Sequence, residues 1–584
     1  MTQSLSADTL EIRKARWMAY ALFAVCLFFY SFSFFKRVHR PIAQDELYYL
    51  EAAKTLYQTG IPVNYLTPNQ ILNYSPPLYL YSIKAAFSFF GAHESVARLV
   101  GFVSGWSTLL LMFVVIRTLI HDSEWEKIKG ATLGCLLYGS TPAFIQGSLM
   151  LDIDNTVLPP IFLLLLLSFV KYQQRKTLRW ALLIGIAVAL ALGVKLTTPV
   201  LAIALLGLFS WVGKNSLRTK LIPMAAILGG TLAFFLLWFL YSKVTGVSFL
   251  GPFRYVLNIF QYRSHSEGGL RLSQIAENFV YLALWLGPFP LLLFTLLAIR
   301  RTMGFLELPA LKHEDLFLIF GLVIVGGYTL IGGAPFGFIK YHCPGIPMMY
   351  VFTAVTLQKK GAIDFSKIPY RTLLFLIGAA LLIHFFTLND LLYVLRYQLR
   401  EAAGFSLPSV QTALFKNVGL KGFLYLLSYA VLSIAAFRRF SIKSASLLLL
   451  LFSLGSNVAM AHVQNFASYS TGYNYGATKT LEAARLIRER AGPKSVVIVP
   501  SDLVYYSDLP LSSSPHLLDR LWNDIEELTK LVADPRAAVF AYSISSNTVE
   551  QIRAISRYPP LQDLLRREFD PSTIGSYRIW IRKK

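Results

Sequence analysis

The sequence predicts a mainly α-helical protein that crosses the bilayer many times, and three observations lead to this fold class. Only 15% of the 584 residues are charged while 55% are hydrophobic, whereas an average soluble protein has about 25% charged residues. Runs such as LIPMAAILGGTLAFFLLWFLY, residues 221–241, are long enough for a membrane helix, which needs roughly 20 apolar residues. The basic residues, finally, recur in short clusters between such runs.

We place about thirteen spans by this length criterion. They start near residues 17, 99, 131, 156, 180, 199, 221, 279, 316, 344, 371, 419 and 444. No small-residue cleavage site follows the first span, which we therefore interpret as a retained anchor and not a signal peptide. Cys26 and Cys135 fall inside predicted spans, so the three cysteines predict no disulfide framework.

The basic clusters predict the orientation of the chain. They lie in alternate loops, at Lys127 and Lys129, Arg175 to Arg179, Lys214 to Lys220, Arg300 and Arg301, Lys359 and Lys360, and Arg438 to Lys443. Such clusters gather on the cytoplasmic side, which places the N-terminus there and, with an odd number of spans, the C-terminus outside. We expect a multi-pass protein of the plasma (inner) membrane. The basic residues that give the net charge of +23 are therefore explained by the orientation of the chain in the membrane, and they do not predict a nucleic-acid partner.

The first outer loop, about residues 37–98, is expected to contain amphipathic helices. Asp45, Tyr49, Ala52 and Leu56 recur at helical spacing, which places Asp45 and Tyr49 on one face. The later stretch NYSPPLYLYSIKAAFSFFG, residues 73–91, is apolar but interrupted by Lys84. It is too short to span, so we expect it at the membrane interface with its tyrosines at headgroup level.

The chain divides into a transmembrane domain, 1–461, and a small outer α/β domain, 462–584. In the second part KSVVIVPSD and AAVFAYSIS have the composition of strands, TLEAARLIRER and QIRAISRY have helical spacing, and SYRIWIRKK alternates like a final edge strand. We expect this domain to serve as a scaffold or to dock an acceptor.

Acidic residues on the outer side are the first candidates for chemistry. Asp45 and Glu46 open the predicted first-loop helix, where acids also favour the helix dipole by roughly 0.3–1 kcal/mol. Asp152 and Asp154 interrupt GSLMLDIDNTVLPPIFLLLL at the end of the third span, and an ionisable group at such depth is a functional hypothesis by default. Two residues apart on a helix, they would point in different directions, so one of them would face the site.

Basic and aromatic candidates lie on the same side. They are Lys195 at the end of the fifth span, Lys340, Tyr341 and His342 between the ninth and tenth spans, and Arg263 and His265 in the loop after the seventh span. A snorkelling lysine would also explain Lys195. Cations and acids together predict an anionic ligand with a part that needs a base, such as a lipid-linked phosphate. Asp152 and Asp154 with Asp45 would also suit Mg²⁺ or Mn²⁺.

The stretches DELYY, SPPLYLY and GAHESVARLVGFVSG resemble the opening of the C-type (GT-C) glycosyltransferase fold. The similarity is greatest to the branch of protein O-mannosyltransferases and of the aminoarabinose transferases that modify lipid A. It covers the first seven or so spans, and more loosely the total of about thirteen with an outer C-terminal domain.

This resemblance implies a polyprenyl-phosphate sugar donor and a lipid, glycan or protein acceptor on the outer face. Asp45 matches the family's catalytic acid, Glu46 and Tyr49 its companions, Asp152 or Asp154 its second acidic position, and Lys340 with Tyr341 its late basic-tyrosine pair. One position departs from the pattern: aminoarabinose transferases have Glu-Lys before the first-loop proline, and here Tyr74 and Ser75 stand there. The departure weakens the case for lipid A as acceptor and leaves Lys84 or Lys195 to contact the donor phosphate.

We therefore expect an inverting transfer in which Asp45 accepts the proton of an acceptor hydroxyl as it attacks the anomeric carbon. Within enzymes, the alternative is transfer of an oligosaccharide from a lipid pyrophosphate with a divalent metal. In other classes, the alternatives are a secondary transporter and a binding or scaffold protein.

Overall fold

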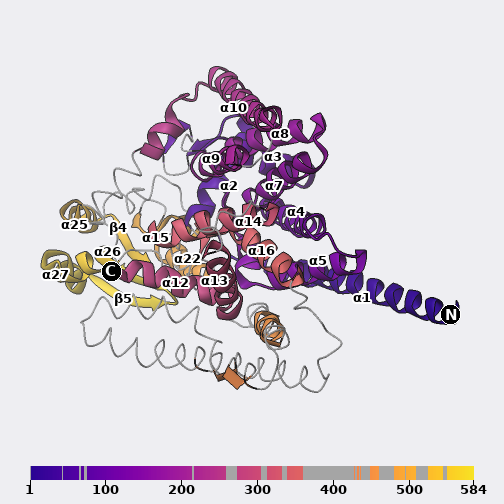
Figure 1. The fold of residues 1–584 in the computed structure, drawn as a ribbon. Helices are drawn as coiled ribbons and strands as arrows, with labels where there is room; N and C mark the ends of the chain where they lie inside the picture. Colours follow the sequence, from indigo (N-terminus) through magenta and orange to yellow (C-terminus); the bar gives the residue numbers. More distant parts are fainter. Residues whose placement is uncertain are drawn as a thin grey trace.

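The computed structural model describes most of the chain as a helical bundle with a small sheet at one end (Figure 1). It covers residues 2–42, 44–64, 67–71, 75–212, 216–257, 272–303, 312–331, 338–359, 448–458, 479–492, 495–507, 524–543 and 549–583, with single positions between 427 and 438. The side chains of Gln44 and Asp45 lie outside this description, although their backbone belongs to a helix.

The first part of the chain consists mainly of helices. They are α1 (Thr2–Phe35), α2 (Gln44–Thr59), α3 (Leu78–Phe90), α4 (Glu94–Leu119), α5 (Glu124–Gly139), α6 (Pro142–Leu149), α7 (Leu158–Arg175), α8 (Leu178–Val194), α9 (Thr197–Val212), α10 (Leu217–Thr245), α12 (Leu272–Leu286), α13 (Pro288–Met303), α14 (His313–Gly321), the π-helix η2 (Leu322–Gly326), α15 (Gly327–Ile331), the 3-10 helix η4 (Lys340–His342) and α16 (Ile346–Lys359). A short helix also covers 448–458. The predicted first-loop helices are confirmed as α2 and α3.

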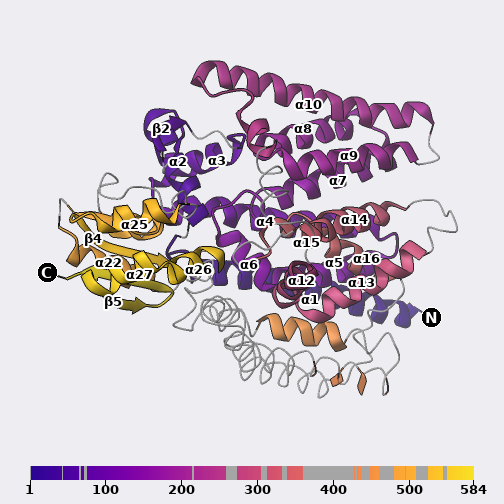
Figure 2. The ribbon, with the colours of Figure 1, turned by 90° about the vertical axis from the view of Figure 1, so that its left-hand side faces the viewer.

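The long helices run side by side, and the two termini lie at opposite ends of the bundle (Figure 2). The N-terminus of α1 is at one end. At the other end α2, α3 and the hairpin of β1 (Val63–Asn64) and β2 (Thr67–Ile71) lie beside the C-terminal sheet. The first-loop elements and the C-terminal part therefore share one end of the bundle.

Several helices are suited to a bilayer by length and composition. Four are long and apolar enough to cross it, at Arg16–Phe35, Glu94–Leu119, Leu217–Thr245 and His313–Ile331, and shorter apolar helices cover Leu78–Phe90, Leu178–Val194, Thr197–Trp211 and Leu448–Val458. The spans predicted near 371 and 419 lie outside the described residues, except for single positions in the second, so the count of thirteen stays a prediction.

Two predicted spans are broken helices. The span expected from residue 279 is instead the pair α12 and α13, because Gly287 between them has a φ of +88°, which ends the first helix. The span expected from residue 131 ends at Gly139, and α6 begins after Thr141, whose hydroxyl caps the new helix by accepting from the Phe144 N–H. Hydropathy alone does not register such breaks.

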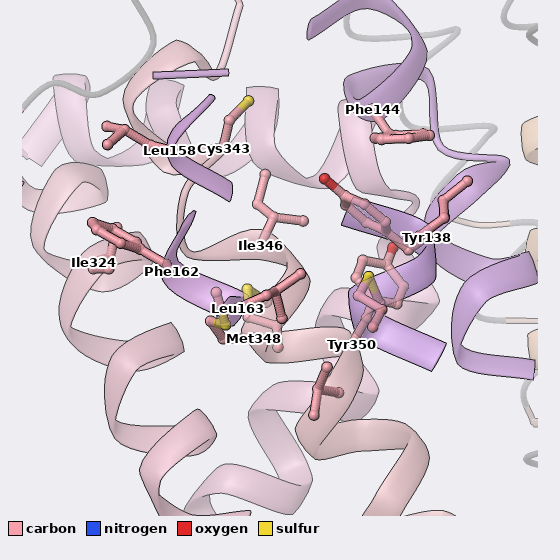
Figure 3. Close-up of a cluster of buried hydrophobic side chains, with 14 of the residues drawn as sticks. Tyr138, Phe144, Leu158, Phe162, Leu163, Ile324, Cys343, Ile346, Met348 and Tyr350 are labelled. Carbon is pink, nitrogen blue, oxygen red and sulfur yellow. The ribbon is translucent and has the colours of Figure 1, made fainter. Parts of the chain in front are cut away.

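The core of the bundle is an apolar cluster in which α5, α6, α7, η2 and α16 meet (Figure 3). Tyr138 packs against Phe144 and Tyr350, with ring centroids 4.7 and 5.6 Å apart. The Tyr350 hydroxyl donates to the Leu286 carbonyl at 3.3 Å, which ties α16 to the end of α12. All three cysteines are buried and free, as the sequence predicts.

Helices α8 and α10 approach so closely that only glycine fits between them. A Cβ at Gly230 would lie 2.1 Å from the Gly185 carbonyl oxygen, whereas a Cβ at the neighbouring Gly229 would meet nothing within 4 Å. Small residues allow this kind of contact between membrane helices.

We therefore expect Gly230→Ala to destabilise the protein by about 1–3 kcal/mol, the usual cost of overpacking. Gly229→Ala is the matched control, because it adds the same methyl group one residue away, and it is expected to be neutral or slightly stabilising. Thermal unfolding of the purified variants in detergent measures both. Equal midpoints for the two variants would contradict the close packing of α8 on α10.

The C-terminal part contains a four-stranded sheet in the order β3-β4-β6-β5. Its elements are α22 (Thr480–Arg490), β3 (Val496–Ile498), α23 (Ser501–Ser507), α25 (Ile525–Ala533), β4 (Ala537–Ser543), α26 (Val549–Arg557), α27 (Pro559–Glu568), β5 (Phe569–Ile574) and β6 (Tyr577–Arg582). Alternate strand residues enter two apolar clusters, one shared with α22 and α23 and the other with α25, α26 and α27. The boundary predicted at 461/462 lies outside the described residues.

The sequence predicts the final strand at the edge of the sheet, and this prediction is wrong. Strand β6 pairs antiparallel with β4 on one side and with β5 on the other. Strand β5 lies at the edge instead. It was not predicted from the sequence, because FDPSTI is polar and contains Pro571. A proline is tolerated at an edge because no neighbour needs its missing N–H.

Candidate functional site

A buried turn between α6 and α7 carries Asp152 and Asp154. The Asp152 carboxylate accepts the Asp154 N–H at 2.9 Å, and the Asp152 carbonyl accepts the Thr156 hydroxyl. The Asn155 amide donates to the Gly147 carbonyl at 2.6 Å, which fastens the turn to α6. These residues are not helical, so the expectation that the two acids point in different directions does not apply.

Each of the two acids binds a lysine from another element. The Lys195 Nζ, at the C-cap of α8, lies 2.5 Å from the Asp154 Oδ2. The Lys340 Nζ, on η4, lies 2.5 Å from the Asp152 Oδ2. The structure thus brings together four sequence-predicted residues from three separate segments.

Tyr341 lies between the two ion pairs. Its ring centroid is 4.6 Å from the Lys195 Nζ and 5.4 Å from the Lys340 Nζ, a separation at which an ammonium is attracted to an aromatic face. Its other neighbour is Tyr328, stacked at 5.4 Å, whose hydroxyl shares a hydrogen bond of 2.8 Å with the Thr198 hydroxyl. We call Asp152, Asp154, Lys195, Lys340 and Tyr341 the lysine-tyrosine cluster.

The ammonium groups are the more accessible members of the two pairs. The side chain of Lys195 is 16% exposed and that of Asp154 1%, while the values for Lys340 and Asp152 are 6% and 0%. Burial alone would lower the pKa of Lys195, but Asp154, Tyr328 and Tyr341 together outweigh burial, so this pKa lies above its ordinary value. Burial raises the pKa of Asp152 to about 6, against the opposing effect of Lys340. Lys195 is therefore the most exposed charged group of the cluster, and the two carboxylates are buried behind the ammonium groups.

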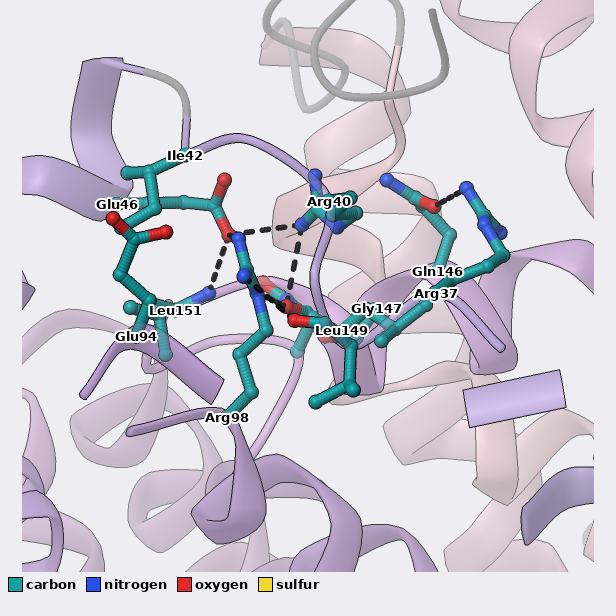
Figure 4. A network of polar contacts seen from close by, with 12 residues as sticks. Arg37, Arg40, Ile42, Glu46, Glu94, Arg98, Gln146, Gly147, Leu149 and Leu151 are labelled. Atoms are coloured by element: carbon teal, nitrogen blue, oxygen red, sulfur yellow. Dashed lines mark hydrogen bonds and ion pairs between the residues drawn. The ribbon is translucent and has the colours of Figure 1, made fainter. Parts of the chain in front are cut away.

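Glu46 is the centre of a second polar cluster, which is shown in Figure 4. It is fully buried, and its Oε1 lies 2.8 Å from Arg40 Nη2 and 3.6 Å from Arg98 Nη2. Both arginines also donate to the Leu149 carbonyl, at 3.2 and 3.0 Å. We call Arg40, Glu46 and Arg98 the arginine-glutamate cluster.

The two clusters meet at the segment that follows α6. Glu46 Oε1 accepts the Leu151 N–H at 3.0 Å, and Asp152 is the next residue. This bond fixes the first turn of α2 beside the turn that carries Asp152 and Asp154. Asp45 is adjacent to Glu46 in that helical turn, so its backbone lies in the same part of the molecule.

Other predicted residues have different surroundings. Tyr49 is buried and packs edge-on against Tyr79 at 5.3 Å, next to this corner on α2. His342 is buried, and its Nε2 shares a hydrogen bond of 3.1 Å with the Thr329 hydroxyl. Lys84 lies over the Tyr81 ring at 5.7 Å and, among the described residues, makes no contact with the lysine-tyrosine cluster. Tyr74, Arg263 and His265 lie outside the described residues.

Arg40, Arg98 and Tyr328 were not predicted from the sequence. Arg98 lies just before the span predicted near residue 99, and only the structure shows that its side chain is fully buried. For Tyr328 the indication comes from the structure and not from the sequence. It follows the π-helix η2, a local irregularity that is frequent at functional sites.

The carboxylates of Asp152 and Asp154 are not freely available to bind a divalent metal. Asp152 and Asp154 each bind an ammonium group, which a cation would have to displace. Within the described residues, no three acidic, histidine or cysteine side chains come together as a metal site requires. Because the Asp45 side chain is not among them, the expectation of Mg²⁺ or Mn²⁺ stays a prediction.

Comparisons with known proteins agree with this architecture. A family model described as dolichyl-phosphate-mannose-protein mannosyltransferase matches residues 74–241, a stretch that contains Asp152, Asp154 and Lys195. A search of curated proteins finds no match.

Among solved structures the chain is similar to ArnT from Cupriavidus metallidurans. The structure bound to undecaprenyl phosphate aligns with a TM-score of 0.55 and 15% identity over 96% of this chain and 97% of that chain. The apo state aligns with a TM-score of 0.54 and 16% identity, over the same shares of the two chains. The fold is thus that of the C-type glycosyltransferases, and the resemblance predicted from the sequence is confirmed. With its apolar helices, the chain is a multi-pass membrane protein.

Proposed function

We propose that the protein is an inverting glycosyltransferase that moves a sugar from a polyprenyl-phosphate donor to an acceptor hydroxyl. The fold and the family match support the general class. The observation that carries the proposal is the lysine-tyrosine cluster, in which buried carboxylates hold the ammonium groups of Lys195 and Lys340 beside Tyr341. Preorganised cations of this kind stabilise the charge of a departing phosphate without having to reorient.

In this mechanism Lys195 and Lys340 hold the donor phosphate, and Asp45 accepts the proton of the acceptor hydroxyl. A lipid phosphate is already a good leaving group, so charge stabilisation at the phosphate and one general base suffice. Attack from the face opposite the phosphate inverts the anomeric configuration. Asp152 and Asp154 keep the two lysines in place, and the arginine-glutamate cluster fixes the start of α2.

We further propose that this corner faces the outer side of the plasma (inner) membrane and that the N-terminus is cytoplasmic. The basic loops predict this orientation. The acceptor is a lipid, a glycan or a protein, and the C-terminal sheet lies at the same end of the bundle as the proposed site.

The phosphate role of Lys195 predicts the effect of Lys195→Met. We expect the KM for the polyprenyl-phosphate donor to rise about 10- to 100-fold, because a charge-assisted hydrogen bond contributes roughly 1.5–3 kcal/mol. Lys129→Met is the matched control, because Lys129 also pairs with a carboxylate, Glu126, at 2.8 Å but belongs to α5. Steady-state transfer with purified protein in lipid nanodiscs measures both. An unchanged KM in folded Lys195→Met would exclude the assignment.

The same preparation distinguishes the alternatives. Transfer that a chelator abolishes and Mg²⁺ or Mn²⁺ restores would favour the metal-dependent use of a lipid pyrophosphate. Flux of substrate into sealed vesicles without transfer would favour a secondary transporter.

A further inference from the structure

One short helix of the C-terminal part contacts the segments next to the proposed site. Helix α23 follows β3 after Pro500 and carries Tyr505 and Tyr506. Both side chains contact the first outer loop, more than 400 residues earlier in the sequence. The mechanism above gives these contacts no role.

The Tyr506 hydroxyl makes two hydrogen bonds at the arginine-glutamate cluster. It accepts the Ile42 N–H at 2.6 Å and donates to Glu94 Oε2 at 3.1 Å. Burial and the nearby Glu94 carboxylate raise the pKa of Tyr506 above its ordinary value, so the hydroxyl keeps its proton and remains a donor. Ile42 itself is almost fully buried, and its N–H needs such a partner.

These bonds complete a closed ring of contacts around residues 40–46. Arg40 and Glu46 join the two ends of this segment at 2.8 Å, and Tyr506 holds Ile42 in its middle. Glu94 lies one helical turn before Arg98 on α4, and Arg98 contacts Glu46 at 3.6 Å. Figure 4 shows that Ile42, Glu46, Glu94 and Arg98 lie near one another. Asp45 belongs to the segment that the ring constrains.

Tyr505, which precedes Tyr506 on α23, contacts helix α2 instead. Its hydroxyl accepts from Lys54 Nζ at 2.9 Å, and the same ammonium lies 5.0 Å from its ring centroid. Lys54 is in the third turn of α2, away from the constrained segment. Tyr505 therefore attaches the C-terminal part to α2 without holding residues 40–46.

We propose that Tyr506 is a positioning residue that holds the segment of residues 40–46, and with it Asp45, in the position needed for proton transfer. The C-terminal part is then a component of the active site's architecture as well as a scaffold. This inference rests on the proposed function, in which Asp45 is the general base.

The experiment compares Tyr506→Phe with Tyr505→Phe, each of which removes one hydroxyl and keeps the ring. We expect Tyr506→Phe to lower kcat on the order of 10-fold or more, because small misplacement of a catalytic group is costly. Its KM for the donor should stay unchanged, since the lysine-tyrosine cluster is intact. Tyr505→Phe should transfer at the wild-type rate. A general loss of structure would instead affect both parameters and the unfolding temperature.

A double-mutant cycle with Asp45→Asn then tests whether Tyr506 acts through Asp45. If it does, Tyr506→Phe causes no further loss in the residual activity of Asp45→Asn. A multiplicative loss, or a Tyr506→Phe rate equal to that of Tyr505→Phe, would overturn the inference. If Asp45→Asn itself transferred at the wild-type rate, the proposed function would fail instead.

Glu94→Leu gives a second route if Tyr506→Phe does not fold. It removes the acceptor of the Tyr506 hydroxyl and retains the bond from Ile42. The same cycle applies: a kcat loss that disappears in the Asp45→Asn background supports the inference, and a wild-type kcat contradicts it.

Discussion

Asp45→Asn is expected to lower the rate of sugar transfer about 10²- to 10⁴-fold, the usual contribution of a general base. Asparagine has almost the same shape as aspartate but cannot accept a proton at neutral pH, so the substitution removes the proposed chemistry with little change in volume. The segment that carries Asp45 is held by Arg40, Glu46 and Tyr506, and these contacts do not depend on the Asp45 charge in the proposed arrangement.

The matched control is Asp122→Asn, which changes the same atoms in an exposed turn before α5. Transfer from a purified polyprenyl-phosphate sugar, in single-turnover conditions, measures the chemical step, and binding of the polyprenyl phosphate is measured separately. We expect Asp45→Asn to bind the donor like the wild type and to lose the rate. A folded Asp45→Asn protein with the wild-type rate would exclude Asp45 as the base.

Glu46→Gln is expected to destabilise the protein by about 3–5 kcal/mol, because removal of one partner leaves buried charges without compensation. Glu46 is the carboxylate that contacts both Arg40 and Arg98, and all three side chains are at most 3% exposed. Glutamine keeps an oxygen that can accept the Leu151 N–H, so the effect reports the lost charge. The expected size is several times that of a surface ion pair, for which 0–1 kcal/mol is usual.

Glu51→Gln is the matched control on the same helix, where Glu51 pairs with Lys54 and is 21% exposed. Denaturation in mixed detergent micelles compares the two variants. Equal stabilities would show that the arginine-glutamate cluster does not hold α2. The assignment of Glu46 as a catalytic residue stays a prediction, and a normal kcat in folded Glu46→Gln would exclude it.

The sequence was sufficient to predict which residue types form the lysine-tyrosine cluster. Asp152, Asp154, Lys195 and Lys340 interrupt apolar segments at helix ends, where a charge is costly, and Tyr341 was predicted from the resemblance to the family's basic-tyrosine pair. The pairing of each acid with a particular lysine was not predictable, because the partners are 41 and 188 residues apart and the turn at 151–157 is not helical.

Breaks in the helices set a similar limit. Apolar composition predicts a span near residue 279, but a single glycine with positive φ divides it into α12 and α13. In the sheet, alternation predicts the strand at residues 577–582 but does not say that β5, with its proline, covers its outer side. Local patterns describe what an element buries and do not identify its neighbours.

The sequence is enough to predict that the chain is a helical membrane protein, which residues are charged within apolar surroundings, and where the loops between spans fall. Those properties follow from the cost of placing polar groups in lipid, which acts on each segment separately. The folded structure is needed to show that Arg40 and Arg98 bind Glu46, that two lysines lie beside Tyr341, and that Tyr506 binds Ile42. These contacts join segments far apart in the sequence, and their geometry depends on how whole helices pack.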